Sequence, residues 1–318
     1  MKDRPMKQKT LSPFLEDLLV SPRTHSTIKL HNGALKSSEG ETYSISDSGI
    51  PLFSADNFSP EGKRQQDHYD RIATAYLRNL EYPHTQEYMK YLDSGFIKMA
   101  LGYKLGMVAE LCCGHGEAIR LLRSEITTGI GFDVSVKMLE EARRQIPEEK
   151  FAFVQGDATM LPLHDACIDS VVMLGGIHHV PDRQRLFSEV FRVLRPGGHF
   201  FWREPVSDFF LWRWIRSVIY RLSPTLDEKT ERPLLYKETI PPLEAAGFRL
   251  KMWRTYGFLG FCFFMNSDVL IFNRLFRFIP GIRFLVRAST RIDDLTLRIP
   301  GLHHFGLQVV GAAQKPVQ

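Results

Sequence analysis

An apolar run at residues 107–111 leads directly into a turn that contains Gly114 and Gly116, with Glu110 just before it. Glycines let the backbone bend sharply and approach a ligand where a Cβ atom would clash. The helix expected after the turn would point backbone N–H groups at the same ligand. A dinucleotide-binding turn needs a third glycine where Ile119 stands, so that class is disfavoured. A tight turn without any ligand is the alternative.

Carboxylates follow the next two apolar runs. Asp133 ends the run at 128–132, and Asp157-Ala158 follow the run at 151–155. A carboxylate at the end of a strand can accept hydrogen bonds from both hydroxyls of a ribose, which is the role we expect for Asp133. Asp157 could accept a hydrogen bond from an exocyclic amine of adenine. Taken singly, each aspartate would also serve as a helix cap or a turn residue.

Titratable groups that could take a proton follow the fourth and fifth apolar runs. His178 and His179 come after the fourth run, and Glu204 ends the fifth. An unperturbed histidine titrates near pH ~6.5, which suits a general base. In the alternative interpretation, one histidine bonds the backbone and the other packs against the strand. His303 and His304 precede the last run and are weaker candidates.

The elements that must position these residues alternate between strand and helix. The predicted strands are 107–111, 128–132, 151–155, 170–174, 199–203, 248–254 and 305–313, and helices are expected at 116–124, 136–145 and 183–194. Strands that alternate with helices indicate a parallel sheet, because parallel neighbours need crossover connections. We therefore predict an α/β fold with a doubly wound, mostly parallel, seven-stranded sheet. Its strand ends would converge on one crevice.

This run of motifs resembles the class I S-adenosylmethionine (SAM)-dependent methyltransferases. The match covers about residues 68–256, resumes at 305–316, and includes Leu161-Pro162-Leu163, His178-His179-Val180, Arg192-Val193-Leu194-Arg195-Pro196-Gly197-Gly198 and Leu243-Glu244-Ala245-Ala246-Gly247-Phe248. Glu110 stands where aspartate is commoner in this family, and Cys112 stands where glycine is common. The resemblance implies a Rossmann-like methyltransferase fold and SAM as the cofactor.

The resemblance also implies a role for each matching residue. Glu110, Gly114 and Gly116 would line the methionine end of SAM, and Asp133 would hold the ribose. Asp157 and Ala158 would hold the adenine, and Tyr69 would cap the cofactor. His178, His179 and Glu204 would lie near the transferred methyl group. No metal site is expected.

Residues 1–56 precede the methyltransferase domain, which we place at 57–318. The segment at 15–53 resembles the small zinc-ribbon modules found beside some methyltransferases, but its expected ligand positions hold Ser21, Thr24, Lys36 and Glu39. None of these is a thiolate, so zinc should not bind. A ribbon that lost its metal but kept a docking role is our hypothesis, and an unrelated loop segment is the alternative.

Two hydrophobic, basic insertions are expected in the second domain, at about 205–237 and 257–303. Aromatic and arginine residues are interspersed at 209–222 and 257–291. Such segments can lie in a membrane interface or cover an apolar pocket. Added core and a dimer interface are the alternatives, and the oligomeric state stays open. The longest uncharged apolar run, 255–267, is shorter than the ~20 residues that span a bilayer.

Composition is that of an ordinary globular protein. The chain has 318 residues, 44% hydrophobic and 24% charged, with a net charge of +5 and four scattered cysteines. The cysteine pattern suits a reducing compartment, and residues 1–10 are too polar for a signal peptide. We predict a cytoplasmic enzyme, peripheral to the inner membrane face, that methylates a small hydrophobic acceptor such as a lipid, isoprenoid or polyketide-like compound. The alternatives are an RNA methyltransferase and a SAM-binding scaffold without turnover, although nucleic acid is not the expected partner because the arginines lie among phenylalanines.

Overall fold

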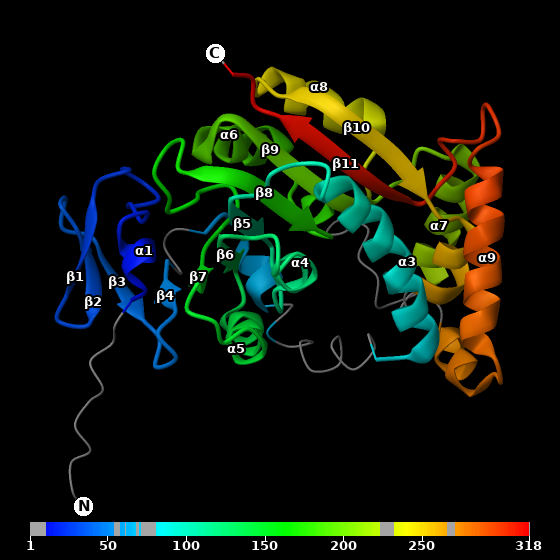
Figure 1. The fold of residues 1–318 in the computed structure, drawn as a ribbon, viewed down its shortest axis with the longest axis horizontal. Helices are drawn as coiled ribbons and strands as arrows, with labels where there is room; N and C mark the ends of the chain where they lie inside the picture. Colours follow the sequence, from blue (N-terminus) through cyan, green and yellow to red (C-terminus); the bar gives the residue numbers. More distant parts are fainter. Residues whose placement is uncertain are drawn as a thin grey trace, which may run out of the picture.

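The computed structural model describes residues 11–53, 58–60, 62–67, 70, 81–222, 232–265 and 271–317. Within them, eleven strands form one mixed sheet in the order β1-β2-β3-β4-β7-β6-β5-β8-β9-β11-β10 (Figure 1). The central strands are β5 (Met107–Leu111), β6 (Thr128–Asp133), β7 (Phe151–Gln155), β8 (Ile168–Leu174), β9 (Leu194–Pro205), β10 (Arg249–Tyr256) and β11 (Gln308–Gln314).

All seven predicted strands are present, and the α/β prediction is confirmed. β7, β6, β5, β8 and β9 run parallel, while β11 lies antiparallel between β9 and β10. The predicted sheet of seven strands is too small, because four N-terminal strands extend its β7 edge. Strand order reverses between β5 and β8, so the crevice for a ligand lies at their carboxyl ends.

Helices cover both faces of the sheet (Figure 1). α3 (Pro83–Ala100), α4 (Glu117–Leu121) and α5 (Val136–Gln145) lie on one face, and α6 (Arg183–Val193) and α8 (Tyr236–Ala245) lie on the other. α5 and α6 begin at side-chain caps, where Ser135 accepts from the Met138 N–H and Asp182 accepts from the Arg185 N–H. The caps start these helices at the ends of the strands that carry the site.

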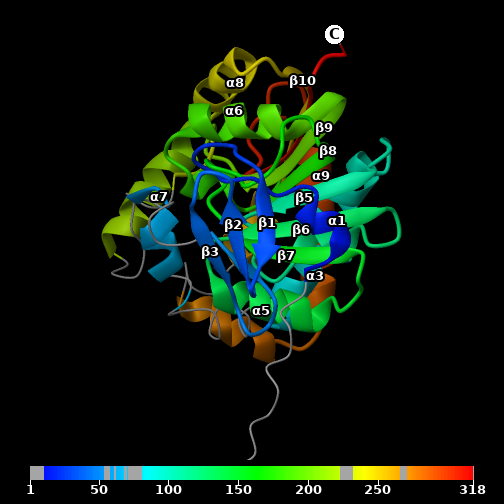
Figure 2. The same ribbon diagram turned by 90° about the vertical axis from the view of Figure 1, so that its left-hand side faces the viewer.

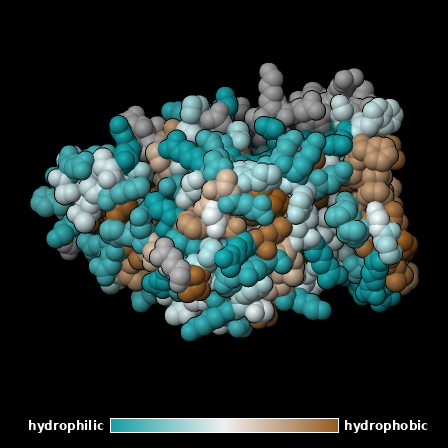
Figure 3. Space-filling view, turned by 90° about the horizontal axis from the view of Figure 1, so that it is seen from above, coloured by the Kyte–Doolittle hydropathy of each residue, from teal (hydrophilic) through white to brown (hydrophobic). Residues whose placement is uncertain are grey.

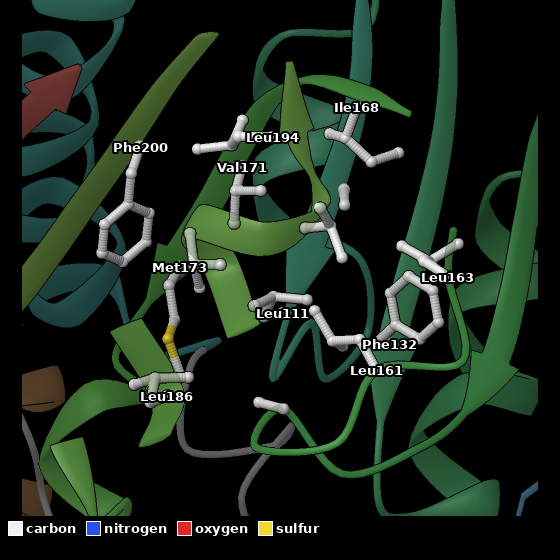
Figure 4. Packing of buried hydrophobic residues seen from close by; sticks show 14 of the residues in the cluster. Leu111, Phe132, Leu161, Leu163, Ile168, Val171, Met173, Leu186, Leu194 and Phe200 are labelled. Carbon is white, nitrogen blue, oxygen red and sulfur yellow. The ribbon is translucent and has the colours of Figure 1, made fainter. Parts of the chain in front are cut away.

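Alternating side chains along each strand separate two hydrophobic clusters. In β5, Val108 belongs to the cluster beneath α3, α4 and α5, whereas Ala109 and Leu111 belong to the cluster beneath α6 and α8. In the second cluster Phe132 lies beside Leu161 and Leu163 (Figure 4). Because the central strands β5, β6, β7 and β8 are buried on both faces, they are mostly apolar, as the sequence pattern indicated.

The N-terminal segment packs directly on the central sheet. It contains α1 (Pro13–Glu16), β1 (Ile28–His31), β2 (Ala34–Ser37), β3 (Thr42–Ile45) and β4 (Pro51–Leu52). β4 pairs in parallel with the end of β7, where Leu52 lies opposite Gln155. Leu35, Tyr43 and Phe53 are buried in the same cluster as the central strands. The strands β1–β3 stand in front of this edge in Figure 2.

The two predicted insertions lie at the opposite end of the molecule (Figure 1). They contain α7 (Phe210–Leu222), η3 (Phe261–Met265), η4 (Ile271–Phe278) and α9 (Ile282–Thr296). α9, η3 and η4 pack against α3. No helix within the described ranges is long and apolar enough to cross a membrane.

Candidate cofactor and active site

A cavity of about 440 Å³ opens at the carboxyl ends of β5, β6, β7 and β8. Its size falls in the range of small-molecule and cofactor sites. The residues that line it come from strand ends and the turns after them, and from the segment at 58–65. The lining includes Phe58, Ser59, Pro60, Gly62, Gln65, Glu110, Cys112, Cys113, Gly114, His115, Glu117, Asp133, Val134, Met138, Gly156, Asp157, Ala158, Thr159, Met160, Leu174, Gly175, His179, Val180, Pro181, Asp182 and Arg185.

The turn after β5 is bent as the two glycines suggested. Gly114 has a φ of 51° and Gly116 has a φ of 78°, both left-handed. A Cβ atom at Gly116 would lie 2.6 Å from the Ile146 side chain, so this glycine allows α4 to start against α5. Gly114 borders the cavity, whereas Gly116 does not. Cys112 also adopts a φ of 50°, a left-handed conformation that glycine reaches more easily than cysteine.

Glu110 holds the start of α4. Its two carboxylate oxygens accept the backbone N–H groups of Ala118, at 2.7 Å, and Ile119, at 2.9 Å. The side chain is fully buried, and burial raises the pKa of Glu110 to about 8 against the effect of these two donors. Glu110 therefore fixes the helix N-terminus that faces the cavity while contributing to the cavity wall.

Asp133 connects the turns after β5 and β6. One oxygen accepts the Gly114 N–H at 2.8 Å, and the other accepts the Ser135 N–H at 2.9 Å. A carboxylate has about four acceptor positions, so about two remain for a ligand. Burial raises the pKa of Asp133 to about 6. The free positions match the two hydroxyls of a ribose, which is the fit that SAM requires here.

Asp157 connects the loop after β7 to the segment at 58–65. One oxygen accepts from the backbone N–H and hydroxyl of Thr159, at 2.8 and 2.7 Å. The other accepts from the N–H and hydroxyl of Ser59, at 2.9 and 2.7 Å. These four bonds use its acceptor positions, so a contact with an adenine amine requires one of them to be exchanged. The buried Ala158 lies beside it in the wall.

Charge in the cavity favours a cation. Within the described residues, its wall contains the carboxylates of Glu117, Asp133, Asp157 and Asp182 against the single guanidinium of Arg185. Glu110 also lines the wall, but its pKa of about 8 keeps it mostly uncharged at neutral pH. A cavity with one sign of charge concentrates ligands of the opposite sign. SAM carries a positive sulfonium, whereas a dinucleotide carries phosphates, so the electrostatics fit SAM better.

Glu204 is buried and positions the loop after β8. Its carboxylate accepts the N–H groups of Gly176, at 2.7 Å, and Ile177, at 2.9 Å, and binds Nδ1 of His178 at 2.7 Å. His178 and His179 form the short helix η2 (Ile177–His179), and their ring centroids are 3.8 Å apart. Only His179 of these three residues borders the cavity. Glu204 thus acts through the loop that it holds.

The structure brings most predicted residues together and separates others. Glu110, Gly114, Asp133, Asp157, Ala158 and His179 border one cavity. Tyr69 lies outside the described residues. His303 and His304 are exposed and do not line the cavity. No described residue of the insertions at 205–237 and 257–303 lines it either, so the described parts of the insertions do not form its wall.

Sequence reasoning missed the contribution of the segment at 58–65. Ser59 precedes Pro60 and accepts the Gly62 N–H at 3.0 Å, which makes it the cap of a helix. Serine followed by proline is a known signature of a helix start and could have located this element. Its approach to Asp157 depends on tertiary structure and has no local signal.

Hydroxyl groups occupy the centre of the N-terminal turns. The Ser21 hydroxyl accepts the Thr24 N–H at 3.2 Å and the Tyr43 hydroxyl at 3.2 Å. The Ser37 hydroxyl accepts the Glu41 N–H at 3.0 Å. Of the four positions compared with zinc ligands, Lys36 and Glu39 are exposed, whereas the neighbouring Ser37 is buried. Strand pairing set which of these side chains are buried, and the local sequence did not reveal it.

Comparison with known proteins agrees with this geometry. Residues 109–202 match the family model described as a methyltransferase domain. The chain is similar to a demethylmenaquinone methyltransferase of Lactococcus lactis, with 38% identity over 97 residues that cover 29% of this chain and 38% of that protein. It is also similar to a 27-O-demethylrifamycin SV methyltransferase of Amycolatopsis mediterranei, with 33% identity over 123 residues that cover 37% and 43%. The matched segments span less than half the length of these curated relatives.

Solved structures support the fold. The [4+2]-cyclase SpnF matches with a TM-score of 0.55 and 19% identity, covering 82% of this chain and 99% of that chain. A SAM-dependent methyltransferase of Thermotoga maritima matches with a TM-score of 0.51 and 19% identity, covering 79% and 99%. The chain therefore contains a methyltransferase domain at residues 109–202, and it shares the fold of these solved structures.

Proposed function

We propose that the protein transfers a methyl group from SAM to a small hydrophobic acceptor. The main support is the acidic cavity at the carboxyl edge of the sheet. It is bordered by a glycine turn and by Asp133, which keeps about two acceptor positions free for a ligand. The two relatives described above are named for a quinone and for a rifamycin as acceptors, which supports a hydrophobic acceptor. The alternative of an RNA methyltransferase lacks such support.

Bound SAM would supply an electrophilic methyl group, and the protein has to align the acceptor with it and exclude water. Asp133 would hold the ribose, and Asp157 and Ala158 would hold the adenine. His179 borders the cavity and would accept a proton from an acceptor that must lose one. Glu204, with its carboxylate bound to the loop, would act as a positioning residue.

Two measurements test this proposal. Calorimetry should detect binding of S-adenosylhomocysteine (SAH), the demethylated product, and labelled SAM should transfer its methyl group to a reduced naphthoquinone. His179→Ala should lower turnover by roughly 10²-fold or more if it is a general base, without a change in SAH affinity. Failure to bind either SAM or SAH would refute the proposal. Unchanged turnover in His179→Ala would exclude only its role as a base.

We also propose that the C-terminal insertion contacts an anionic membrane at the inner face. α9 supports this idea because it carries three stripes. One is buried against α3 and contains Ile282, Val286, Thr290 and Asp293; the next contains the exposed Arg283, Arg287 and Arg291; the third contains the exposed Leu285, Ile292 and Leu295. An exposed apolar stripe beside a row of arginines is typical of helices that lie in a membrane interface.

Neighbouring elements extend the apolar surface. Phe210 and Trp214 of α7 are 67% and 68% exposed, and Phe278 and Phe284 are 68% and 69% exposed. Hydrophobic surface gathers at the end of the molecule where α7 and α9 lie (Figure 3). Arginines attract anionic headgroups, and the apolar side chains bury in the acyl boundary, so a membrane fits this surface better than RNA does.

Vesicle sedimentation tests the membrane proposal. The protein should bind vesicles that contain phosphatidylglycerol at low salt and should bind pure phosphatidylcholine weakly. Leu285→Ser should weaken binding about tenfold, because burial of a leucine contributes roughly 1.5 kcal/mol or more. Leu101→Ser is the matched control, since Leu101 is 49% exposed and Leu285 is 46% exposed. Equal effects of the two variants, or no binding at all, would argue against the proposal.

We propose further that the N-terminal segment braces the loop after β7, which would hold the adenine. Phe53 donates its N–H to Gln155 at 3.2 Å, just before the loop, and Val20 donates to Pro162 at 3.1 Å, just after it. The buried Leu19 pairs with Leu163. Leu19→Ala should therefore weaken SAH binding more than Leu30→Ala, at the half-buried outer strand β1. Equal SAH affinity in both variants would contradict this role.

A further inference from the structure

Three side chains on one face of α3 have buried polar atoms without a hydrogen-bond partner. His84, Thr85 and Tyr88 are at most 2% exposed. Both ring nitrogens of His84, the Thr85 hydroxyl and the Tyr88 hydroxyl find no partner within the part of the chain that the structure describes. Positions 84, 85 and 88 share a helix face. An unpaired buried polar group is costly, so a cluster of them requires an explanation.

Aromatic rings surround this cluster. The His84 ring stacks on Tyr82 with centroids 5.7 Å apart, and it lies 6.4 Å from Phe264 and 6.1 Å from Phe276. Phe264 belongs to η3 and Phe276 to η4, so the cluster lies between α3 and the C-terminal insertion. Flat apolar walls with a few polar groups are the usual composition of a site for a small organic ligand.

Glycines let the insertion cover Tyr88. A Cβ atom at Gly257 would lie 2.1 Å from the Tyr88 hydroxyl, and one at Gly260 would lie 2.4 Å from its ring. The cover continues as η3, a π-helix, and η4, a 3₁₀-helix. Such irregular helices are frequent at functional sites and are easier to rearrange than an α-helix.

The polar groups of the cluster are uncharged. Burial lowers the pKa of His84, which keeps its ring neutral, and raises the pKa of Tyr88, which keeps its phenol protonated. A neutral imidazole and two hydroxyls offer both donors and acceptors without a net charge. The complementary ligand is a neutral molecule with hydroxyl or carbonyl oxygens.

α3 also connects this cluster to the cofactor cavity. Asp93, on the same helix, binds the buried Arg203, and Arg203 binds Glu117 at 2.7 Å. Glu117 lines the cavity. The helix that carries His84, Thr85 and Tyr88 is therefore linked to the cavity wall by a buried ion-pair network.

We propose that His84, Thr85 and Tyr88 bind the oxygen atoms of a neutral aromatic ligand between α3 and the C-terminal insertion. Identification of this ligand with the methyl acceptor rests on the proposed function, whereas the binding site itself does not. Entry of the ligand requires η3 and η4 to move away from α3. The site would select acceptors with a hydroxyl or carbonyl group over plain hydrocarbons.

Two matched probes test the proposal: 1-naphthol, which has one hydroxyl, and naphthalene, which has none. The intact protein, without cofactor, should bind 1-naphthol at least about tenfold more tightly than naphthalene, because one well-placed hydrogen bond gives roughly that factor. Thr85→Val and Tyr88→Phe keep the shapes of the side chains and remove only the hydroxyls. Each should reduce the preference to within about threefold while naphthalene affinity and the thermal midpoint stay unchanged or rise.

Tyr91→Phe is the control, since the Tyr91 hydroxyl already donates to Asp294 at 2.6 Å. This variant should lower the thermal midpoint and keep the naphthol preference. The proposal is overturned if the intact protein shows no preference, if both test variants retain it, or if they lose stability as Tyr91→Phe does. SAH calorimetry on the same samples distinguishes the proposed ligand site from the proposed function. A protein that binds no SAH but still prefers 1-naphthol would refute the proposed function and leave the ligand site standing.

Discussion

Replacement of Asp133 by asparagine should separate the proposed ribose contact from general electrostatics. The carboxylate accepts one N–H from Gly114 and one from Ser135, which leaves about two acceptor positions for ribose hydroxyls. A hydrogen bond to a charged group contributes at least about 1.5 kcal/mol, so two of them contribute about 3 kcal/mol. Asp133→Asn should therefore weaken SAH binding by roughly 150-fold.

The pH dependence provides a second readout for the same residue. Burial raises the pKa of Asp133 to about 6, and only the ionised form accepts both hydroxyls well. SAH affinity of the wild type should then fall as pH drops below 6, by up to about tenfold per pH unit. The free energy of unfolding depends on pH in the opposite direction. Because the folded state raises the pKa of Asp133, this carboxyl stabilises the fold at low pH, and that contribution is lost as the pH rises from the usual pKa of an aspartate through 6. The SAH affinity of the asparagine variant should show a flatter profile.

Calorimetric titration with SAH between pH 5 and pH 8 measures both effects. Asp182→Asn is the control, because Asp182 lines the same cavity but caps α6 through the Arg185 N–H. It removes one negative charge near the site without touching Asp133. An affinity of Asp133→Asn within about threefold of the wild type, or an equal loss in the control, would refute the assigned ribose contact.

Three further substitutions test how the sheet supports the site. Gly311→Ala places a Cβ atom 2.0 Å from the buried Trp202 ring and should cost about 1–3 kcal/mol in urea denaturation; an unchanged midpoint would contradict the packing. Arg203→Met removes the cation between two carboxylates and should cost about 3–5 kcal/mol, and a stability equal to the wild type would show that the ion pairs contribute nothing. Glu204→Gln should cost about 1–3 kcal/mol by loss of one acceptor and lower turnover through the His178 loop, whereas normal values of both would exclude a positioning role.

The local sequence pattern predicted most of the fold and part of the site. Apolar runs that alternate with capped helices predicted the seven central strands, since this period is a property of neighbouring residues. Gly114, Asp133 and Asp157 were found because carboxyl ends of parallel strands always meet at one edge. Ser135 and Asp182 are helix caps within the same few residues that they stabilise.

Long-range contacts decided the rest. Ser59 meets Asp157 across 98 residues, and Arg203 meets Asp93 across 110, distances at which sequence period carries no information. The same holds for β4, whose pairing with β7 enlarged the sheet, and for the burial of Ser37 next to the exposed Lys36. The insertions were recognised as aromatic and basic from the sequence, but packing of α9, η3 and η4 on α3 set which residues stay exposed. Burial of an apolar face depends on which element is available to cover it, and only the assembled fold determines that.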